Sequence, residues 1–92
     1  MNDSYILTLA KTSLQISSPA YDSFLWSSLQ MARAAVTREG ITISNSEEDN
    51  MLLAMYTAYL FNKRRDNAPM PRALRYALNN RLISEKGAVV DG

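Results

Sequence analysis

The chain contains no cysteine and no histidine among its 92 residues. Without cysteine it can form neither a disulfide framework nor a thiolate metal site. Without histidine it lacks the most common general base, the most common neutral metal ligand and the usual switch near neutral pH. Glycine is scarce too, and its three residues stand at the ends of segments, so no glycine-rich phosphate loop is present. We therefore expect no enzymatic activity, no cofactor and no bound metal.

Long hydrophobic runs and a strong excess of one charge are missing as well. The most apolar stretch, residues 51–61, is too short to span a bilayer, which needs about 20 residues. No signal-peptide pattern opens the chain, so we expect it to fold in the cytoplasm. The net charge is +1, but residues 1–50 carry three basic and six acidic residues, and residues 51–92 carry seven and three. This asymmetry predicts either a surface that faces nucleic acid or complementary patches on neighbouring copies.

Residues 51–61 are the stretch around which the chain is organised. At about 100° per residue, their apolar side chains point all the way around a helix axis, so no face is left for water. Such a helix has to be covered by the rest of its own chain, by other copies, or by both. A chain of this size buries only about 60–65% of the surface that it exposes when unfolded, so we expect other copies to supply part of the cover.

Apolar periodicity and capping residues predict three further helices. They cover residues 4–15, 19–39 and 71–86, on either side of the central helix. Pro19 and Pro71 suit the first position of a helix, and Gly40 suits the position just after a helix end. The predicted fold class is all-α, a compact four-helix single domain over residues 1–92, with residues 87–92 as a flexible tail.

A short β-branched segment, residues 41–43 (ITI), lies between the second and the central helix. Its alternation of apolar and polar residues predicts a very short extended or β segment. A single strand has no partner within the chain. The segment is therefore either an extended connector, which we favour, or an edge strand that pairs with another copy.

The central helix has oppositely charged ends. Ser44 with Glu47 fits a capping box, and Ser46 offers a second N-cap. Residues 47–49 (EED) place negative charge at the positive end of the helix dipole, and residues 63–65 (KRR) complement its negative end. We favour this capping role over metal binding, because consecutive carboxylates on a helix point in different directions.

Two side chains do not fit the pattern of their helices. The second helix has an apolar arc of roughly 160° that includes Tyr21, Leu25 and Met31 and that we expect to face the core. Trp26 falls outside this arc, so it either folds over the flank of the first helix or forms an interaction hot spot. Arg81 lies within the apolar arc of the last helix. It either extends its charge to water or pairs with a carboxylate from another segment, because a buried and unpaired arginine is costly.

The order and spacing of several short segments resemble those of the small head–tail connector (adaptor) proteins of tailed bacteriophages. The resemblance covers nearly the whole chain and departs from the family pattern at Lys63, which directly follows Asn62, and at Ser46 and Glu47, which replace a proline. Its most specific part is residues 58–64 (AYLFNKR), followed by residues 70–71 (MP) and 78–81 (LNNR); the earlier matching segments are residues 14–16 (LQI), 22–25 (DSFL) and 32–36 (ARAAV).

This resemblance implies a helical structural protein that forms a homo-oligomeric ring, dodecameric in the family, beneath the phage portal protein. The ring would extend the DNA channel and join the head to the next connector, stopper or tail protein. DNA would pass through it without sequence-specific binding, and no membrane would be involved. The implied location is the head–tail interface of the virion, with the host cytoplasm during assembly.

The predicted interface residues fall into three groups. Lateral contacts between subunits are expected from Trp26, Ile41, Ile43, Tyr56 and Tyr59. The acidic group is Glu47, Glu48 and Asp49. We expect it to meet the basic group of a neighbour, which alternatively lines the DNA channel and consists of Lys63, Arg64, Arg65, Arg72 and Arg75.

A small helical DNA-binding regulator is the alternative function. Two helices joined by a short turn, with Arg72 and Arg75 early in the second, superficially match a helix-turn-helix motif. Three features disfavour it: the central helix is too apolar to lie across a phosphate backbone, the Pro-x-Pro linker at residues 69–71 is long and stiff, and the net charge is low. A helical module that binds another cytoplasmic partner is a third alternative.

Overall fold

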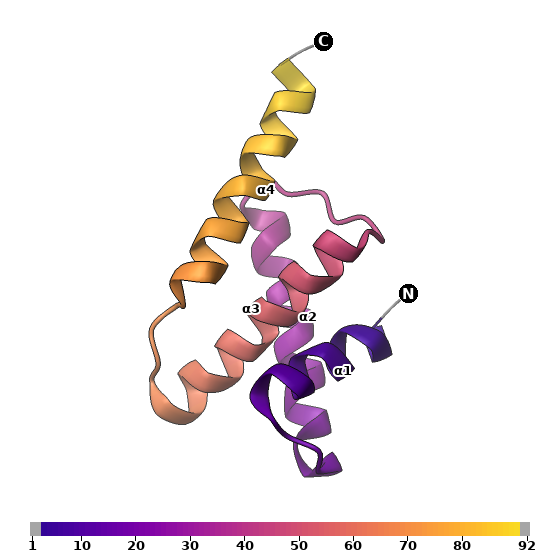
Figure 1. The fold of residues 1–92 in the computed structure, drawn as a ribbon, viewed down its shortest axis with the longest axis vertical. Coiled ribbons are helices and arrows are strands. Elements are labelled where there is room, and N and C mark those ends of the chain that lie inside the picture. The colour runs from indigo at the N-terminus through magenta and orange to yellow at the C-terminus, as the bar shows by residue number, and fades with distance from the viewer. Residues whose placement is uncertain (1–2, 91–92) are drawn as a thin grey trace.

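The computed structural model describes residues 3–90, which form four helices and one short 3-10 turn (Figure 1). The elements are α1 (Asp3–Leu14), the 3-10 turn η1 (Pro19–Tyr21), α2 (Asp22–Arg38), α3 (Glu47–Asp66) and α4 (Arg72–Val90). Within the described range there is no strand. The predicted all-α, four-helix class is confirmed.

Local signals set the end of α2 as predicted, but its start differs, because Pro19–Tyr21 form a separate 3-10 turn and α2 begins at Asp22 without a side-chain cap. Ser18 accepts a hydrogen bond from the Ala20 N–H at 3.1 Å, and Pro19 opens the turn that leads into the helix. At the other end Gly40 has a φ of 102°, a left-handed conformation that glycine adopts without strain. The N–H groups of Gly40 and Ile41 reach back to the last turn of α2, to the carbonyls of Thr37 and Val36. This bonding closes the helix.

Ser46 begins α3, because its hydroxyl accepts a hydrogen bond from the Asp49 N–H at 3.2 Å. The predicted capping box between Ser44 and Glu47 does not form. The Glu47 carboxylate instead accepts a hydrogen bond from the Tyr5 hydroxyl of α1. At the far end, Asn67 ends the helix in a left-handed conformation with a φ of 56°.

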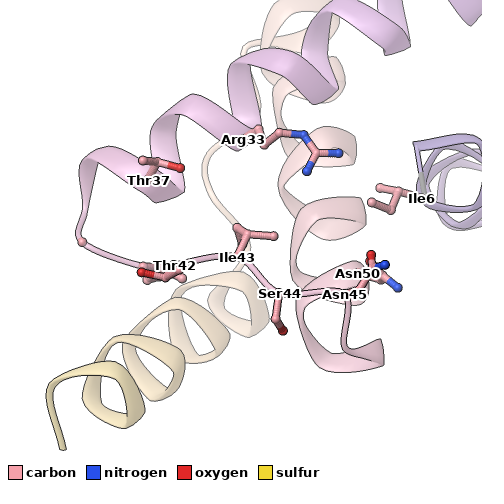
Figure 2. A pocket seen from close by; sticks show the side chains of 10 residues that line it. Ile6, Arg33, Thr37, Thr42, Ile43, Ser44, Asn45 and Asn50 are labelled. Atoms are coloured by element: carbon pink, nitrogen blue, oxygen red, sulfur yellow. The ribbon is translucent and has the colours of Figure 1, made fainter. Parts of the chain in front are cut away.

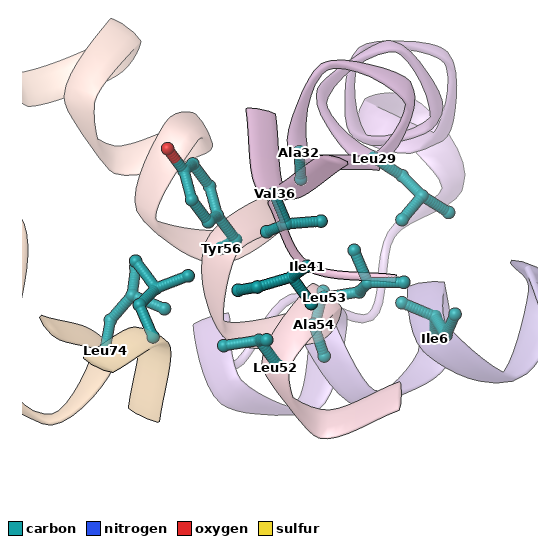
Figure 3. Close-up of a cluster of buried hydrophobic side chains, with 12 residues drawn as sticks. Ile6, Leu29, Ala32, Val36, Ile41, Leu52, Leu53, Ala54, Tyr56 and Leu74 are labelled. Carbon is teal, nitrogen blue, oxygen red and sulfur yellow. The ribbon is translucent and has the colours of Figure 1, made fainter. Parts of the chain in front are cut away.

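Helix α3 is the centre of the fold. It packs against α1 and α2 on one side and against α4 on the other (Figure 1). Figure 3 shows the main cluster of buried side chains, in which Leu52, Leu53 and Ala54 of α3 meet residues of all three neighbours. The cover is incomplete along one line of the helix, where Met51 is 42% exposed and Met55 and Tyr59 are only partly buried. The chain therefore wraps most of α3 by itself and leaves an apolar stripe.

Helix α4 is attached to the fold mainly through its first half. Leu74 and Leu78 are buried, and Leu82 is partly buried against the same cluster. The helix continues through Gly87 to Val90, four residues beyond the predicted end at residue 86, and its second half projects from the body of the molecule (Figure 1). Of the predicted tail, residues 91 and 92 lie outside the described residues.

The connector at residues 41–46 is irregular, and its backbone is bonded within the chain. The Thr42 N–H donates to Glu85 at 3.1 Å, and the Thr42 carbonyl accepts from Arg81 at 2.7 Å. The Ser44 N–H donates to Asp49 at 2.8 Å. Because these groups already have partners, they are not available for a strand ladder, and residues 41–43 form no strand in the structure.

Candidate interaction surfaces

Three aromatic rings hold the basic end of α3 in place. The Lys63 ammonium lies 5.9 Å from the ring centroid of Tyr59, and the guanidinium of Arg65 lies 4.9 Å from that of Phe61. Arg64 stacks on Phe24 of α2 at 5.4 Å. Such cation–π contacts contribute about 0.5–1 kcal/mol each at exposed sites. They also limit the conformations that the three cations sample, so the basic end is a partly ordered surface.

A groove lies between α2 and the last turns of α3. Its apolar lining comes from Phe24, Met31 and Leu60, and Lys63 and Arg64 stand among the residues that line it. We call these five residues the basic groove; the cavity there has a volume of about 290 Å³. Met31 is 58% exposed and Tyr21 is 43% exposed, so the prediction that these two side chains face the core is wrong, although Leu25 is fully buried. Sequence reasoning missed this groove because α2 turns only part of its apolar arc toward α3.

At the opposite end of α3, the three predicted acidic residues have different surroundings. Glu47 is bonded to Tyr5, and this hydrogen bond raises the pKa of the tyrosine hydroxyl. Glu48 is exposed and forms no ion pair within residues 3–90. It lines a hollow of about 250 Å³ between α3 and α4 together with Met51, Met55 and Arg81, whose charge is already paired with Asp49 and Glu85. We call Glu48, Met51 and Met55 the acidic surface.

Asp49 points into the protein instead of toward a neighbour. Its carboxylate receives hydrogen bonds from Arg81 Nε at 2.8 Å and from the Ser44 N–H and hydroxyl at 2.8 and 2.9 Å. Burial raises the pKa of Asp49, but the hydrogen bonds from Arg81 and Ser44 outweigh burial and hold it below its ordinary value. Of the two alternatives predicted for Arg81, the structure shows the pairing with a carboxylate from another segment. Asp49 therefore serves the fold of its own chain.

The five residues predicted to make lateral contacts differ in how far they are exposed to solvent. Ile41 and Tyr56 are buried in the core shown in Figure 3, and burial raises the pKa of Tyr56. Ile43 and Tyr59 are partly buried at its margin. Trp26 is 46% exposed. Of the five, Trp26 offers the largest exposed apolar area to a partner.

Trp26 lies beside a hollow between α1 and α2. Leu7 and Lys11 of α1 line this hollow together with Trp26 and Asp22 of α2, and its volume is about 630 Å³. Lys11 and Asp22 form an ion pair at 2.8 Å within the same group of residues. Trp26 therefore lies beside the flank of α1 and still faces solvent, and its role as an interaction hot spot stays a prediction.

The remaining predicted basic residues stand at the start of α4, next to the basic end of α3 (Figure 1). Arg72 and Arg75 are exposed, and neither forms an ion pair in the part of the chain that the structure describes. Arg65 is the exception in the basic group, because it pairs with Asp66 at 3.1 Å. The structure thus places the five predicted basic residues at one end of the molecule.

A hollow of about 590 Å³ with a mixed polar and apolar lining lies among α1, α2, the connector and α3 (Figure 2). Arg33, Thr42, Ser44 and Asn50 contribute most of its polar groups, with Ile6 on one wall. The Arg33 guanidinium is already neutralised by Asp3, with which it forms an ion pair. No nucleophile–base pair is found among these side chains. The hollow therefore offers no catalytic arrangement.

The described residues hold no group of acidic side chains that is arranged to bind a metal ion. None of the helices in residues 3–90 combines the length and apolar character that a bilayer crossing requires. Comparison with known proteins finds no matching family model, no matching curated protein and no matching solved structure. The functional argument therefore depends on the surfaces described above.

Proposed function

We propose that the chain is a structural head–tail connector subunit of a tailed bacteriophage. In this role its copies form a ring beneath the portal protein, extend the DNA channel, and join the head to the next connector, stopper or tail protein. The family resemblance of residues 58–64, 70–71 and 78–81 supplies the phage context. The surfaces of the fold support an assembly role.

The observation that carries this proposal is the separation of opposite charges along α3. The helix has 20 residues, so its acidic and basic ends lie about 30 Å apart, on opposite sides of the molecule (Figure 1). A subunit with complementary patches at two different places can bind the next copy head to tail. Repeated contacts of this kind form a ring when the rotation between copies closes.

Exposed apolar side chains support the same role. Large hydrophobic residues remain 41–67% exposed on several helices, among them Tyr5, Tyr21, Trp26, Met31, Met51, Tyr76 and Ile83. Apolar surface stabilises a protein by about 25 cal/mol for each Å² removed from water. Tyrosine, tryptophan and methionine are also enriched in the cores of protein interfaces. A ring would bury part of this surface between neighbours.

Measurement of mass in solution tests the proposal. The purified chain is expected to form a closed oligomer, either alone at high concentration or after addition of a purified phage portal protein. Light scattering and negative-stain images would detect the ring and its attachment to the portal. A chain that stays monomeric at high concentration and also fails to bind the portal protein would contradict the proposal.

The basic end supports a second, separable expectation about DNA. Lys63, Arg64, Arg72 and Arg75 face solvent, so we expect at most weak binding to DNA that falls steeply with salt and ignores base sequence. The alternative function, a DNA-binding regulator, has one favourable observation: Arg72, Arg75 and Tyr76 are exposed along one helix. Binding that depends on base sequence and is lost in Arg72→Ala and Arg75→Ala would favour the regulator over the connector.

A further inference from the structure

The basic groove and the acidic surface are complementary in both charge and apolar character. The groove presents Met31 and Leu60 next to two cations, and the acidic surface presents Met51 next to Glu48. We propose that the basic groove of each copy receives the acidic surface of a second copy of this chain. This inference names the contact through which the proposed ring would form, and it rests on the proposed function for the closure of that ring.

The charged groups of both surfaces are available for such a contact. Glu48, Lys63 and Arg64 form no ion pair within the described part of the chain. Arg64 is held over the ring of Phe24 at 5.4 Å, which leaves the edges of its guanidinium open to a carboxylate. Because this orientation exists before binding, less side-chain entropy is lost when the contact forms.

The apolar parts of the two surfaces match as well. Met31 is 58% exposed and Met51 is 42% exposed, and both are unbranched side chains that adapt to irregular surfaces. In the contact, Met51 of one copy lies against Met31 and Leu60 of the next, and Glu48 lies against Arg64. On α3, Glu48 and Met51 are three residues apart and are therefore neighbours on the helix surface.

The positions of the two surfaces on α3 distinguish a head-to-tail contact from a two-fold dimer. At about 100° per residue, Leu60 and Arg64 point about 170° away from the mean direction of Glu48 and Met51. Along the axis, Glu48 and Arg64 are about 24 Å apart. A single partner subunit cannot contact Glu48 and Met51 on one face of α3 and Leu60 and Arg64 on the opposite face at the same time. The acidic surface and the groove therefore bind two different neighbours, as in a ring.

Disulfide crosslinking tests the contact directly, because the natural chain has no cysteine. The variants Met31→Cys and Met51→Cys are prepared separately, mixed and exposed to a mild oxidant. A disulfide forms only when the two Cα atoms come within about 7 Å. We expect the Met31–Met51 mixture to give a covalent dimer at least about tenfold faster than a Met31–Ile83 mixture. Ile83→Cys is the matched control, since Ile83 is 67% exposed and lies on α4 outside both surfaces.

Charge reversal gives an independent test of the same contact. Glu48→Lys and Arg64→Glu are each introduced into both cysteine variants, and each is expected to slow crosslinking by about tenfold or more, because like charges then face each other. The double change Glu48→Lys with Arg64→Glu is expected to restore crosslinking. Crosslinking no faster than the Ile83 control, or unchanged by either single reversal, would overturn the inference.

The two proposals fail in different ways. If the natural chain forms a ring on the portal protein and the Met31–Met51 disulfide stays at the control rate, the contact is wrong and the connector function stands. If the disulfide forms specifically and neither a ring nor a portal complex is found, the contact is correct and the connector function is wrong.

Discussion

Arg81 of α4 donates from Nε to the Asp49 carboxylate in the first turn of α3, at 2.8 Å and across 32 positions of sequence. The same guanidinium donates to Glu85 at 2.9 Å and to the Thr42 carbonyl at 2.7 Å. One side chain thus joins α3, the connector and α4. This ionic cluster therefore attaches the middle of α4 to the connector and to the first turn of α3.

Replacing Arg81 by methionine is expected to destabilise the fold strongly. The side chain of Asp49 is 1% exposed, and the substitution leaves its charge buried without its main partner. Removal of one member of a buried ion pair costs about 3–5 kcal/mol. Urea unfolding followed by circular dichroism measures the change. Arg75→Met is the matched control on the same helix, and because Arg75 is exposed its effect should stay within about 0.5 kcal/mol. A loss below about 1 kcal/mol for Arg81→Met would contradict this prediction.

The same cluster predicts how stability depends on pH. The pKa of Asp49 lies below its ordinary value of 3.8, and that of Glu85, which accepts from the Thr42 N–H and from Arg81, lies below its ordinary value of 4.5. A carboxylate whose pKa is lowered by folding stabilises the protein above its unfolded pKa, and this stabilisation is lost as the pH falls through the folded pKa. The free energy of unfolding should therefore hold steady from pH 7 to about pH 5 and decrease below about pH 4.

Asp49→Asn isolates the contribution of one carboxylate to this curve. The variant is less stable at pH 7, and its free energy of unfolding should fall less steeply than that of the natural chain between pH 4 and pH 2. Urea unfolding at a series of pH values gives both slopes. Parallel curves for the two proteins would show that folding does not change the pKa of Asp49.

Replacement of glycine by alanine should change stability in opposite directions at Gly40 and Gly87. Gly40 has a φ of 102°, which an alanine adopts only with strain, so Gly40→Ala is expected to cost about 1–2 kcal/mol. An added Cβ would meet only the Leu82 side chain at an ordinary 3.8 Å, so the cost comes from the backbone. Gly87 lies within α4 and nothing stands within 4 Å of its added Cβ. Gly87→Ala should therefore stabilise the protein by about 0.5–1 kcal/mol. Thermal unfolding measures the change in melting temperature of each variant. Changes of the same sign in both variants would contradict this prediction.

Trp26 reports on assembly because it is the only tryptophan. It is half exposed in the single chain, so its fluorescence should shift to shorter wavelength when a neighbouring copy covers it. Trp26→Ala is expected to weaken ring formation by about 2 kcal/mol per contact, the size of an interface hot spot. Gln30→Ala, an exposed polar residue of the same helix, serves as the control and should leave assembly unchanged. An emission maximum that stays the same in monomer and ring would exclude Trp26 from the interface.

Much of the fold could be predicted from local sequence signals. The caps at Ser46 and Gly40 and the apolar stretch at residues 51–61 lie where the helices begin, end and cross the core, whereas Ser18 caps the 3-10 turn that precedes α2. The end of α4 was predicted less well, since Gly87 did not stop the helix. Glycine in a helix costs only about 1 kcal/mol, so neighbouring residues can override it.

The surfaces were harder to predict than the helices. Met31 belongs to the apolar arc of α2 by periodicity, yet it lies on the surface although Leu29 and Ala32 beside it are buried, because α2 turns only part of that arc toward α3. Asp49 stands in an acidic run that suits helix capping, and periodicity could not show that Arg81 would reach it. Periodicity assigns a side chain to a face of its own helix. It does not show how much of that face the neighbouring helices cover.

The sequence by itself determined the all-helical class, the central position of residues 51–61 and the opposite charges at the two ends of that helix. These properties follow from interactions between residues three or four positions apart, which are encoded locally. Only the tertiary structure decided which charges remain available. Asp49 and Arg81 are 32 positions apart in the sequence, and the crossing of α3 and α4 brings them together. Of the acidic residues 47–49, Asp49 is therefore buried against the guanidinium, whereas Glu48 stays exposed. The groove, by contrast, is made by the packing of α2 on the last turns of α3, and its distance from the acidic surface along α3 is the physical basis of the proposed ring.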